Sequence, residues 1–247
     1  MKFENTEVFN FKGALRGMRN PKNSWDRSDS KFDDGECYLP ENNECEACSQ
    51  FDGFGKPCLP LIGENDMKLA QALIRGGSEH RKFLRQIFVS VDITAPLYWW
   101  KEFDTYKVGT VANSTSTMHK LASTPITMDC FEIDDYSTLK PEYDDNHPYH
   151  ESFVYKVITW LEHLRSRYLS TKDKRYWKEL IRWLPESWLQ TRTVTMNYEN
   201  LLTICQQRRH HKLNEWSGVD DPTKPNFISW AKTLPYANEL IFLEKEE

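Results

Sequence analysis

The alternation of residue types between positions 86 and 93 constrains the fold more than any other feature of the sequence. Every second residue of this segment is a branched apolar one: Ile87, Val89, Val91 and Ile93. Side chains two residues apart project from the same face of an extended chain, so the pattern predicts a half-buried strand. We therefore expect a sheet that other elements cover on one face.

The stretch from Asp92 to His119 continues from this strand and has the composition of a ligand pocket. Pro96 suits the first turn of a helix that we expect to reach about Lys107. The helix is rich in aromatic residues, and Ala112–Thr117 is a run of small polar residues that suits close backbone approach. This mixture favours a pocket for a planar, phosphorylated ligand.

The same aromatic residues have a second, structural interpretation. Trp99 and Phe103 are spaced so that they share one helical face. Aromatic residues at helical spacing are usually part of a core or an interface between subunits. Both interpretations stay open at this point.

The remainder of the chain alternates between strand and helix patterns. We expect short strands at 8–11, 124–133 and 190–196, and helices at 65–77, 151–168, 172–184, 197–209 and, interrupted at Pro235, 227–242. Residues 134–150 are rich in acidic residues and tyrosine, and we expect them to form an exposed connection between two of these elements. The order predicts an α+β fold in which a mixed sheet packs with helices, the long helices lying in the C-terminal half.

Residues 31–63 show no periodicity and are expected to form a Cys-rich loop inserted into a single domain that spans residues 1–247. The loop holds Cys37, Cys45, Cys48 and Cys58. A Cys-x2-Cys unit directs two thiolates at one ion, and the flanking cysteines complete a tetrahedral set, so a structural zinc is one interpretation. Free thiols and a disulfide are the alternatives. Cys130 and Cys205 fall in apolar settings, where thiols are usually inert.

Residues 13–30 are rich in Arg, Asn and Ser, and Asn20-Pro21 ends any helix there. One interpretation is a solvated surface loop. The other is a basic lid that covers an anionic ligand through Arg16 and Arg19.

The overall composition excludes several classes of protein. The 32 basic and 37 acidic residues give a net charge of −5, whereas duplex nucleic-acid binders usually carry a basic excess. We expect no nucleic-acid partner. No apolar run reaches the length of a membrane span, and the N-terminus has no apolar signal core, so we expect a cytoplasmic protein without a membrane partner.

Two blocks of the sequence resemble flavin-dependent thymidylate synthases. In the first block, the family's Leu-Pro, extended arm, Thr-x-Asn and helix ending in arginine match Leu184-Pro185, Thr195, Asn197, Leu201 and Arg208 without gaps. The second block, His80 to His119, is similar to the family's histidine, strand, Ala-Pro, aromatic helix and signature loop. The resemblance spans roughly residues 65–240.

The resemblance implies a fold and a reaction. Members of the family make thymidylate (dTMP) from deoxyuridylate (dUMP), use FAD, methylene-tetrahydrofolate and NADPH, and form homotetramers with sites built between subunits. They activate the uracil ring without a cysteine nucleophile, and reduced flavin supplies the hydride.

The resemblance also implies roles for individual residues. The cofactor-binding residues are expected to be His80, Tyr106, Lys107, Asn113 and Asn197. The residues expected to bind the dUMP-like nucleotide are Glu102, Thr115, Ser116, Thr117 and Arg208.

The sequence departs from the family at its signature. The family has Arg-His-Arg where this chain has Thr105-Tyr106-Lys107, and only Lys107 keeps a charge. Each lost charged contact to a phosphate removes about 1.5–3 kcal/mol of binding if nothing replaces it. Two explanations stay open. Either the ligand differs from that of the family, or one of these cations supplies a replacement donor for the phosphate: Arg16, Arg19, Lys107, Lys120 or Arg192.

Two functions follow from these patterns. The first is an FAD-dependent thymidylate synthase-like enzyme, or a close relative that transfers a one-carbon unit to a pyrimidine nucleotide. The alternative is a non-catalytic nucleotide- or flavin-binding or assembly protein that kept the fold and lost the signature.

Overall fold

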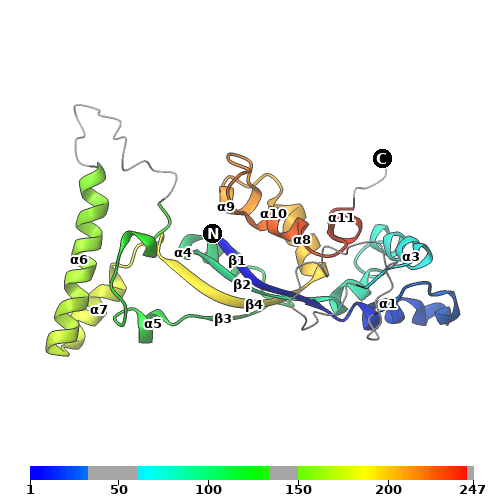
Figure 1. The fold of residues 1–247 in the computed structure, drawn as a ribbon, viewed down its shortest axis with the longest axis horizontal. Coiled ribbons are helices and arrows are strands. Elements are labelled where there is room, and N and C mark those ends of the chain that lie inside the picture. Colours follow the sequence, from blue (N-terminus) through cyan, green and yellow to red (C-terminus); the bar gives the residue numbers. More distant parts are fainter. Residues whose placement is uncertain (33–59, 134–149, 244–247) are drawn as a thin grey trace, which may run out of the picture. The chain divides into compact units, whose positions relative to one another are not determined.

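The structure is a computed structural model that describes residues 1–32, 60–133 and 150–243 (Figure 1). Helices and an antiparallel sheet alternate along the chain, which confirms the expected α+β class. The chain divides into two compact units. The first comprises residues 1–5, 91–107 and 111–194, and the second comprises residues 6–90, 108–110 and 195–247.

Within the described ranges, four strands form one sheet in the order β1-β2-β4-β3. They are β1 (Lys2–Phe9), β2 (Phe88–Pro96), β3 (Val111–Ser114) and β4 (Leu189–Asn197). The expected alternation on β2 is confirmed, because its buried residues are separated by half-buried ones. The hydrophobic pattern therefore sets which face of this strand is covered.

Side-chain hydrogen bonds show the register of the central strands. Asp92 accepts a bond from Thr193 at 2.5 Å, and the hydroxyls of Thr94 and Thr191 lie 2.7 Å apart. As the number rises on β2 it falls on β4, so the two strands are antiparallel. Asp92 also accepts a bond from Asn5 of β1 at 2.8 Å.

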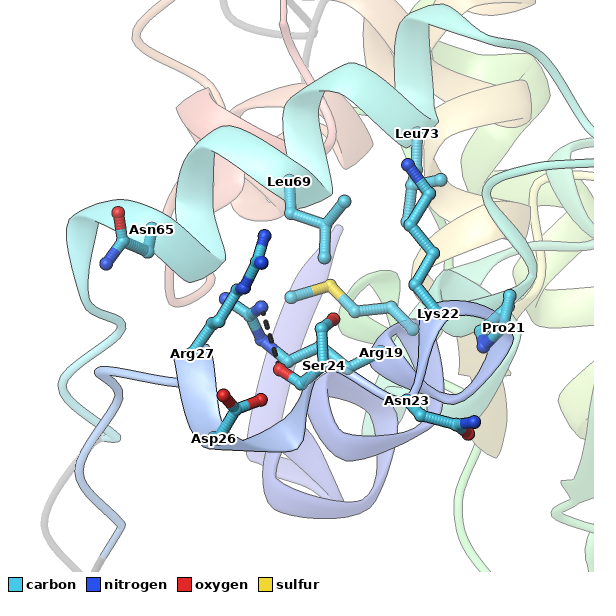
Figure 2. A pocket seen from close by; sticks show the side chains of 11 residues that line it. Arg19, Pro21, Lys22, Asn23, Ser24, Asp26, Arg27, Asn65, Leu69 and Leu73 are labelled. Carbon is cyan, nitrogen blue, oxygen red and sulfur yellow. Dashed lines mark hydrogen bonds between the residues drawn. The ribbon is translucent and has the colours of Figure 1, made fainter.

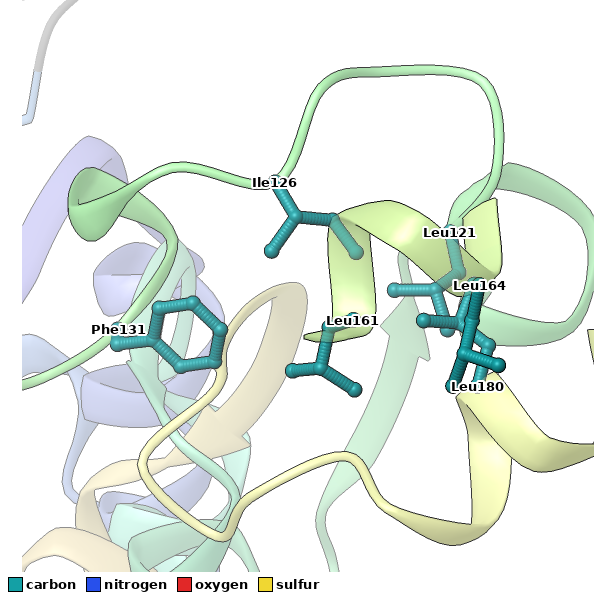
Figure 3. Packing of buried hydrophobic residues seen from close by; sticks show 6 residues of the cluster. All are labelled: Leu121, Ile126, Phe131, Leu161, Leu164 and Leu180. Atoms are coloured by element: carbon teal, nitrogen blue, oxygen red, sulfur yellow. The ribbon is translucent and has the colours of Figure 1, made fainter. Parts of the chain in front are cut away.

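The first unit carries two long helices beside its strands. Helix α6 (His150–Thr171) packs against α7 (Lys174–Arg182), and the two confirm the helices expected at 151–168 and 172–184. Two shorter helices, α4 (Leu97–Phe103) and α5 (Thr117–Lys120), belong to the same unit. A buried cluster fills the space beside α6 and α7 (Figure 3), and its members are Leu121, Ile126, Phe131, Leu161, Leu164 and Leu180.

The second unit is mainly helical. Its helices are α1 (Phe11–Arg19), α3 (Glu64–Arg75), α8 (Tyr198–Arg208), α9 (Asn214–Ser217), α10 (Phe227–Lys232) and α11 (Ala237–Leu240). Three 3-10 turns, Asn20–Lys22 (η1), Trp25–Arg27 (η2) and Lys82–Gln86 (η3), join them. The core lies where α8 packs on η3 and α10, and its largest fully buried side chains are Trp216, Tyr198, Phe227, Leu15, Leu84 and Ile87.

Several boundaries differ from the sequence-based expectation. The helix expected to reach Lys107 ends at Phe103. After it, the N–H of Asp104 donates to the Trp100 carbonyl and the N–H of Tyr106 donates to the Phe103 carbonyl. Residues 111–114, expected to be part of a loop, form strand β3. Residues 124–133, expected to be a strand, contain a short 3-10 turn (η4, Met128–Cys130) and a single bridge from Phe131 to Trp188.

The N-terminal segment is also more regular than expected. The predicted strand at 8–11 ends at Phe9, and helix α1 begins two residues later. Asn10, between them, adopts a left-handed backbone conformation with φ +73°, which asparagine tolerates better than most residues. As predicted, Asn20-Pro21 follows the last helical residue.

Helix α6 is the longest helix among the described residues. It is too polar to cross a membrane, and none of the other helices in the described ranges has the length and apolar content for a span.

Candidate functional site

In the first unit, α4 and the segment after it carry several of the residues that the sequence predicts to bind flavin and nucleotide. The ring of Tyr106 is half-buried against Phe103, with 6.5 Å between the ring centroids. Lys107 is exposed, and Glu102 is half-buried on α4. The signature position therefore presents one ordered aromatic ring and one exposed cation where the family has three basic residues.

The hydroxyl-rich segment is held to strand β4 through its backbone. Thr115 donates its N–H to the Thr191 carbonyl at 2.9 Å, and its carbonyl accepts from Gln190 Nε2 at 2.9 Å. The Thr115 side chain is exposed, so its hydroxyl faces solvent from a fixed backbone. Asn113, on β3, is exposed as well.

Ser116 and Thr117 have structural roles at the start of helix α5. The Ser116 hydroxyl accepts the N–H of His119 at 3.2 Å and so caps the helix. Thr117 is half-buried, and its carbonyl accepts the N–H of Leu121.

Arg192 is a strongly constrained cation of the first unit. Its guanidinium donates to Asp104 Oδ1 at 2.7 Å and to Gln190 Oε1 at 3.0 Å. It also lies over the ring of Trp100, whose indole N–H donates to the Gln190 carbonyl at 2.9 Å. The Arg192 side chain is only 15% exposed. The expectation that Arg192 replaces a missing phosphate donor is weakened, because Asp104 already neutralises its charge.

In the second unit, Asn197 begins helix α8. Its side-chain oxygen accepts the N–H of Asn200 at 2.9 Å, and the Asn200 oxygen accepts the N–H of Asn197 at 3.2 Å. This reciprocal pair is a capping box. The cap fixes the orientation of the Asn197 amide, because its oxygen must face the helix. The Nδ2 group of Asn197 donates to no described residue, so it is the part of the side chain that remains for a ligand.

Asn200 also holds the loop at residues 108–110. Its Nδ2 donates to the Val108 carbonyl at 2.7 Å. Gly109 adopts φ +79°, and a Cβ added there would lie 2.9 Å from Asn200 Oδ1 and 3.1 Å from Asn197 Nδ2. Only glycine allows this close approach without strain. The sequence analysis did not identify Asn200, although the Asn-x-x-Asn spacing is a signal for a capping box.

Arg208 lies at the other end of helix α8. Its guanidinium carbon is 4.9 Å from the centroid of the fully buried Trp216 ring. The arginine is half-buried and therefore has a defined orientation. At the start of the same helix, Glu199 accepts two bonds from Arg81 Nε, at 3.0 and 2.9 Å.

His80 is exposed in the turn that follows α3. Its backbone N–H donates to the Gly77 carbonyl, and its ring packs near Gly76. In the described parts of the chain, no hydrogen bond joins His80 to Asn197 or Arg208. The structure thus places Asn197 and Arg208 on one helix but does not bring His80 into contact with them.

Arg19 fits neither the solvated loop nor the basic lid that the sequence suggested for residues 13–30. It is buried, its Nε lies 2.5 Å from Asp66 Oδ1, and its Nη1 donates to the Ser24 carbonyl at 3.2 Å. This ion pair fixes the α1 end to α3 within the second unit. Arg16 is exposed on α1.

The proposed zinc ligands Cys37, Cys45, Cys48 and Cys58 lie outside the described residues. Within residues 1–32, 60–133 and 150–243, no group of three or more His, Cys, Asp or Glu side chains is placed to hold a metal. Burial raises the pKa of the Cys205 thiol to about 12, which agrees with its expected inert role. Cys130 is half-buried in η4, not in a strand.

Comparisons with known proteins give a fold and no sequence family. The chain matches none of the models of known protein families, and no curated protein matches its sequence. Its fold is similar to that of flavin-dependent thymidylate synthase ThyX from Helicobacter pylori complexed with FAD and dUMP, with a TM-score of 0.58, 16% identity and 98% coverage of both chains. A second structure of that protein with FAD and dUMP gives a TM-score of 0.55 and 15% identity over 96% of this chain and 94% of that chain.

Proposed function

We propose that this protein binds FAD and a dUMP-like nucleotide and acts as a thymidylate synthase-like enzyme. The observation that carries the proposal is the fold likeness, which covers 98% of this chain and of a chain complexed with FAD and dUMP. The reaction is the reductive methylation of dUMP to dTMP with methylene-tetrahydrofolate and NADPH, or a related one-carbon transfer to a pyrimidine nucleotide. Bound FAD, once reduced by NADPH, would supply the hydride.

The second unit offers two groups suited to these ligands. Asn197 Nδ2 is an amide donor whose orientation the helix cap fixes, and it suits a carbonyl oxygen of the flavin ring. Arg208 is a guanidinium held over Trp216, and it suits the nucleotide phosphate. Both residues match the family pattern position by position.

The first unit offers donors that differ from those of the family. Thr115 presents its hydroxyl from a backbone pinned to β4, and Tyr106 presents a half-buried ring. Lys107 and Lys120 are exposed cations that make no ion pair with any described residue. These lysines are the cations that replace the family's missing arginines as phosphate donors.

The test is the binding of FAD to the full chain. Calorimetry and the change in the absorption spectrum of FAD measure this binding. Asn197→Ala removes both the cap and the Nδ2 donor, whereas Asn197→Asp keeps an oxygen for the cap, removes the donor and adds a negative charge. Asn226→Ala is the matched control, because Asn226 is also buried and also caps a helix, α10, through a capping box. We expect both Asn197 variants to bind FAD at least about tenfold more weakly than the wild type.

The control separates capping from ligand binding. We expect Asn226→Ala to lose stability without losing FAD affinity beyond about twofold, since removal of a cap costs about 1 kcal/mol. Wild-type protein that binds no FAD at high micromolar concentration contradicts the proposal. Native mass spectrometry of the same sample reports FAD, zinc and the number of subunits, which tests the expected homotetramer and the expected metal.

A specific observation favours the second candidate function, a flavin- or nucleotide-binding protein without catalysis. Arg192 is already paired with Asp104 and Gln190, and the signature lacks both arginines. Protein that binds FAD but forms no dTMP from dUMP, methylene-tetrahydrofolate and NADPH supports this function.

A further inference from the structure

A cleft in the second unit lies between the η1–η2 segment and helix α3 (Figure 2). Its volume is about 850 Å³. The polar lining includes Lys22, Asn23, Asp26, Arg27 and Asn65, and the apolar lining includes Met18, Leu69 and Leu73. A cleft of this size can hold a drug-sized organic molecule.

Two of its cations have no ion-pair partner among the residues that the structure describes. The charge of Arg19, which also lines the cleft, is paired with Asp66. Lys22 and Arg27 are exposed and form no ion pair with a described residue. Asp26 is the single acidic residue in the lining. The cleft therefore carries an excess of positive charge that an anion can offset.

The two cations reach toward successive turns of the same helix. Figure 2 shows that Lys22 extends toward Leu73 and that Arg27 extends toward Leu69. Both side chains are long and flexible, so a phosphate that lies between them can accept hydrogen bonds from both.

The apolar part of the cleft lies beside these cations. Leu69 and Leu73 are half-buried on α3, so each offers apolar surface to whatever fills the cleft. Two of the N–H groups in the first turn of α3 are not available to an anion, because Asp29 accepts those of Asn65 and Asp66 at 2.9 and 3.1 Å. Recognition of an anion here therefore depends on side chains.

We propose that this cleft binds an organic phosphate ester, with its phosphate between Lys22 and Arg27 and its apolar or aromatic body on Leu69 and Leu73. The site lies wholly within the second unit and uses neither Asn197 nor Arg208. It is therefore independent of the proposed FAD and dUMP site, and either can fail without the other.

Calorimetry of the full chain with phenyl phosphate tests the proposal. We expect saturable binding that is about 10- to 100-fold weaker in Lys22→Glu and in Arg27→Glu, because each variant loses a charge-assisted contact and gains a repulsive charge. Lys12→Glu is the control, since Lys12 is an exposed cation on α1 outside the lining. It is expected to keep wild-type affinity within about twofold.

Partial ligands separate the contributions to binding. Inorganic phosphate and phenol alone are each expected to bind at least about tenfold more weakly than phenyl phosphate, since each meets only half of the cleft. Competition by dUMP identifies a nucleotide as the phosphate source, and a lack of competition identifies a non-nucleotide ester; both agree with the proposal. Absent binding, or equal losses in Lys22→Glu and Lys12→Glu, overturns it.

Discussion

The guanidinium of Arg192 stacks on the ring of Trp100, with 4.2 Å between its central carbon and the ring centroid. Asp104 and Gln190 hold the same guanidinium at its edge. A guanidinium that lies over a ring and is hydrogen-bonded at its edge is a geometry that arginine provides and lysine does not. Arg192 therefore links the segment after α4 to strand β4 within the first unit.

Replacement of Arg192 by lysine is expected to lower the free energy of unfolding by about 1–2 kcal/mol, because the stacking and one of the two hydrogen bonds are lost. Urea denaturation measures the change. Arg175→Lys serves as the control: its side chain is 89% exposed and its partner is a single surface carboxylate, so no measurable change is expected. Equal stability of the two variants would contradict the role given to Arg192.

Replacement of Asp66 by asparagine is expected to lower the free energy of unfolding by about 3 kcal/mol. The Asp66 side chain is fully buried, and the substitution leaves Arg19 with an uncompensated charge. Glu64→Gln, on the same helix, is the control, because Glu64 and Lys68 form a pair that is 78% and 71% exposed. If urea denaturation gives both variants the same free energy of unfolding, the buried Arg19–Asp66 pair does not stabilise the fold more than the exposed Glu64–Lys68 pair does.

The protein is expected to become less stable at acidic pH, because the Asp66 carboxylate becomes protonated. Burial raises the pKa of this carboxyl, but hydrogen bonds from Ser28, Ser30 and Arg19 outweigh it and hold the pKa below the ordinary value of 3.8. A carboxyl with a lowered pKa in the folded state stabilises the fold above its unfolded pKa, and this contribution is lost as the pH falls through the folded value.

Urea midpoints measured from pH 7 down to about pH 3 test this dependence on pH. The wild type is expected to lose stability below about pH 4, while Asp66→Asn, which cannot titrate, is expected to show a shallower decline. Parallel profiles would assign the acid sensitivity to other carboxyls, such as Glu162, whose pKa the Arg165 hydrogen bond lowers.

Alanine substitutions at Gly109 and Gly77 test whether the loop at 108–110 packs tightly on the start of helix α8. Both have positive φ, +79° and +95°, so alanine is strained at either position. A Cβ at Gly77 meets nothing within 4 Å, whereas one at Gly109 meets the fixed side chain of Asn200 at 2.9 Å. Gly109→Ala is expected to cost about 1–2 kcal/mol more than Gly77→Ala in thermal or urea unfolding. Equal costs would show that the loop moves away freely.

The sequence predicts those elements that have a covered face. Strand β2 shows its alternation because one side is buried, and α6 shows its helical period because Leu161 and Leu164 face the core cluster. Asn197 is also placed correctly, at the junction of β4 and α8.

The sequence does not predict elements that lack such a face. Strand β3 lies at the edge of the sheet and all four of its residues are exposed, so no burial pattern marks it. The burial of Arg19 depends on Asp66, which lies 47 positions away in the sequence. The candidate site also depends on a contact between distant positions. Asp104, 88 positions before Arg192, pairs with the Arg192 guanidinium, and the sequence does not show this pairing.

The double use of the Asn200 side chain has a consequence for motion. One amide group accepts the Asn197 N–H and donates to the Val108 carbonyl. Lifting the loop at 108–110 therefore breaks a bond to the residue that closes the first turn of α8, so loop opening and helix fraying belong to one event. The amide protons of Asn197 and Asn200 are expected to exchange with deuterium together, at a rate that the loop sets.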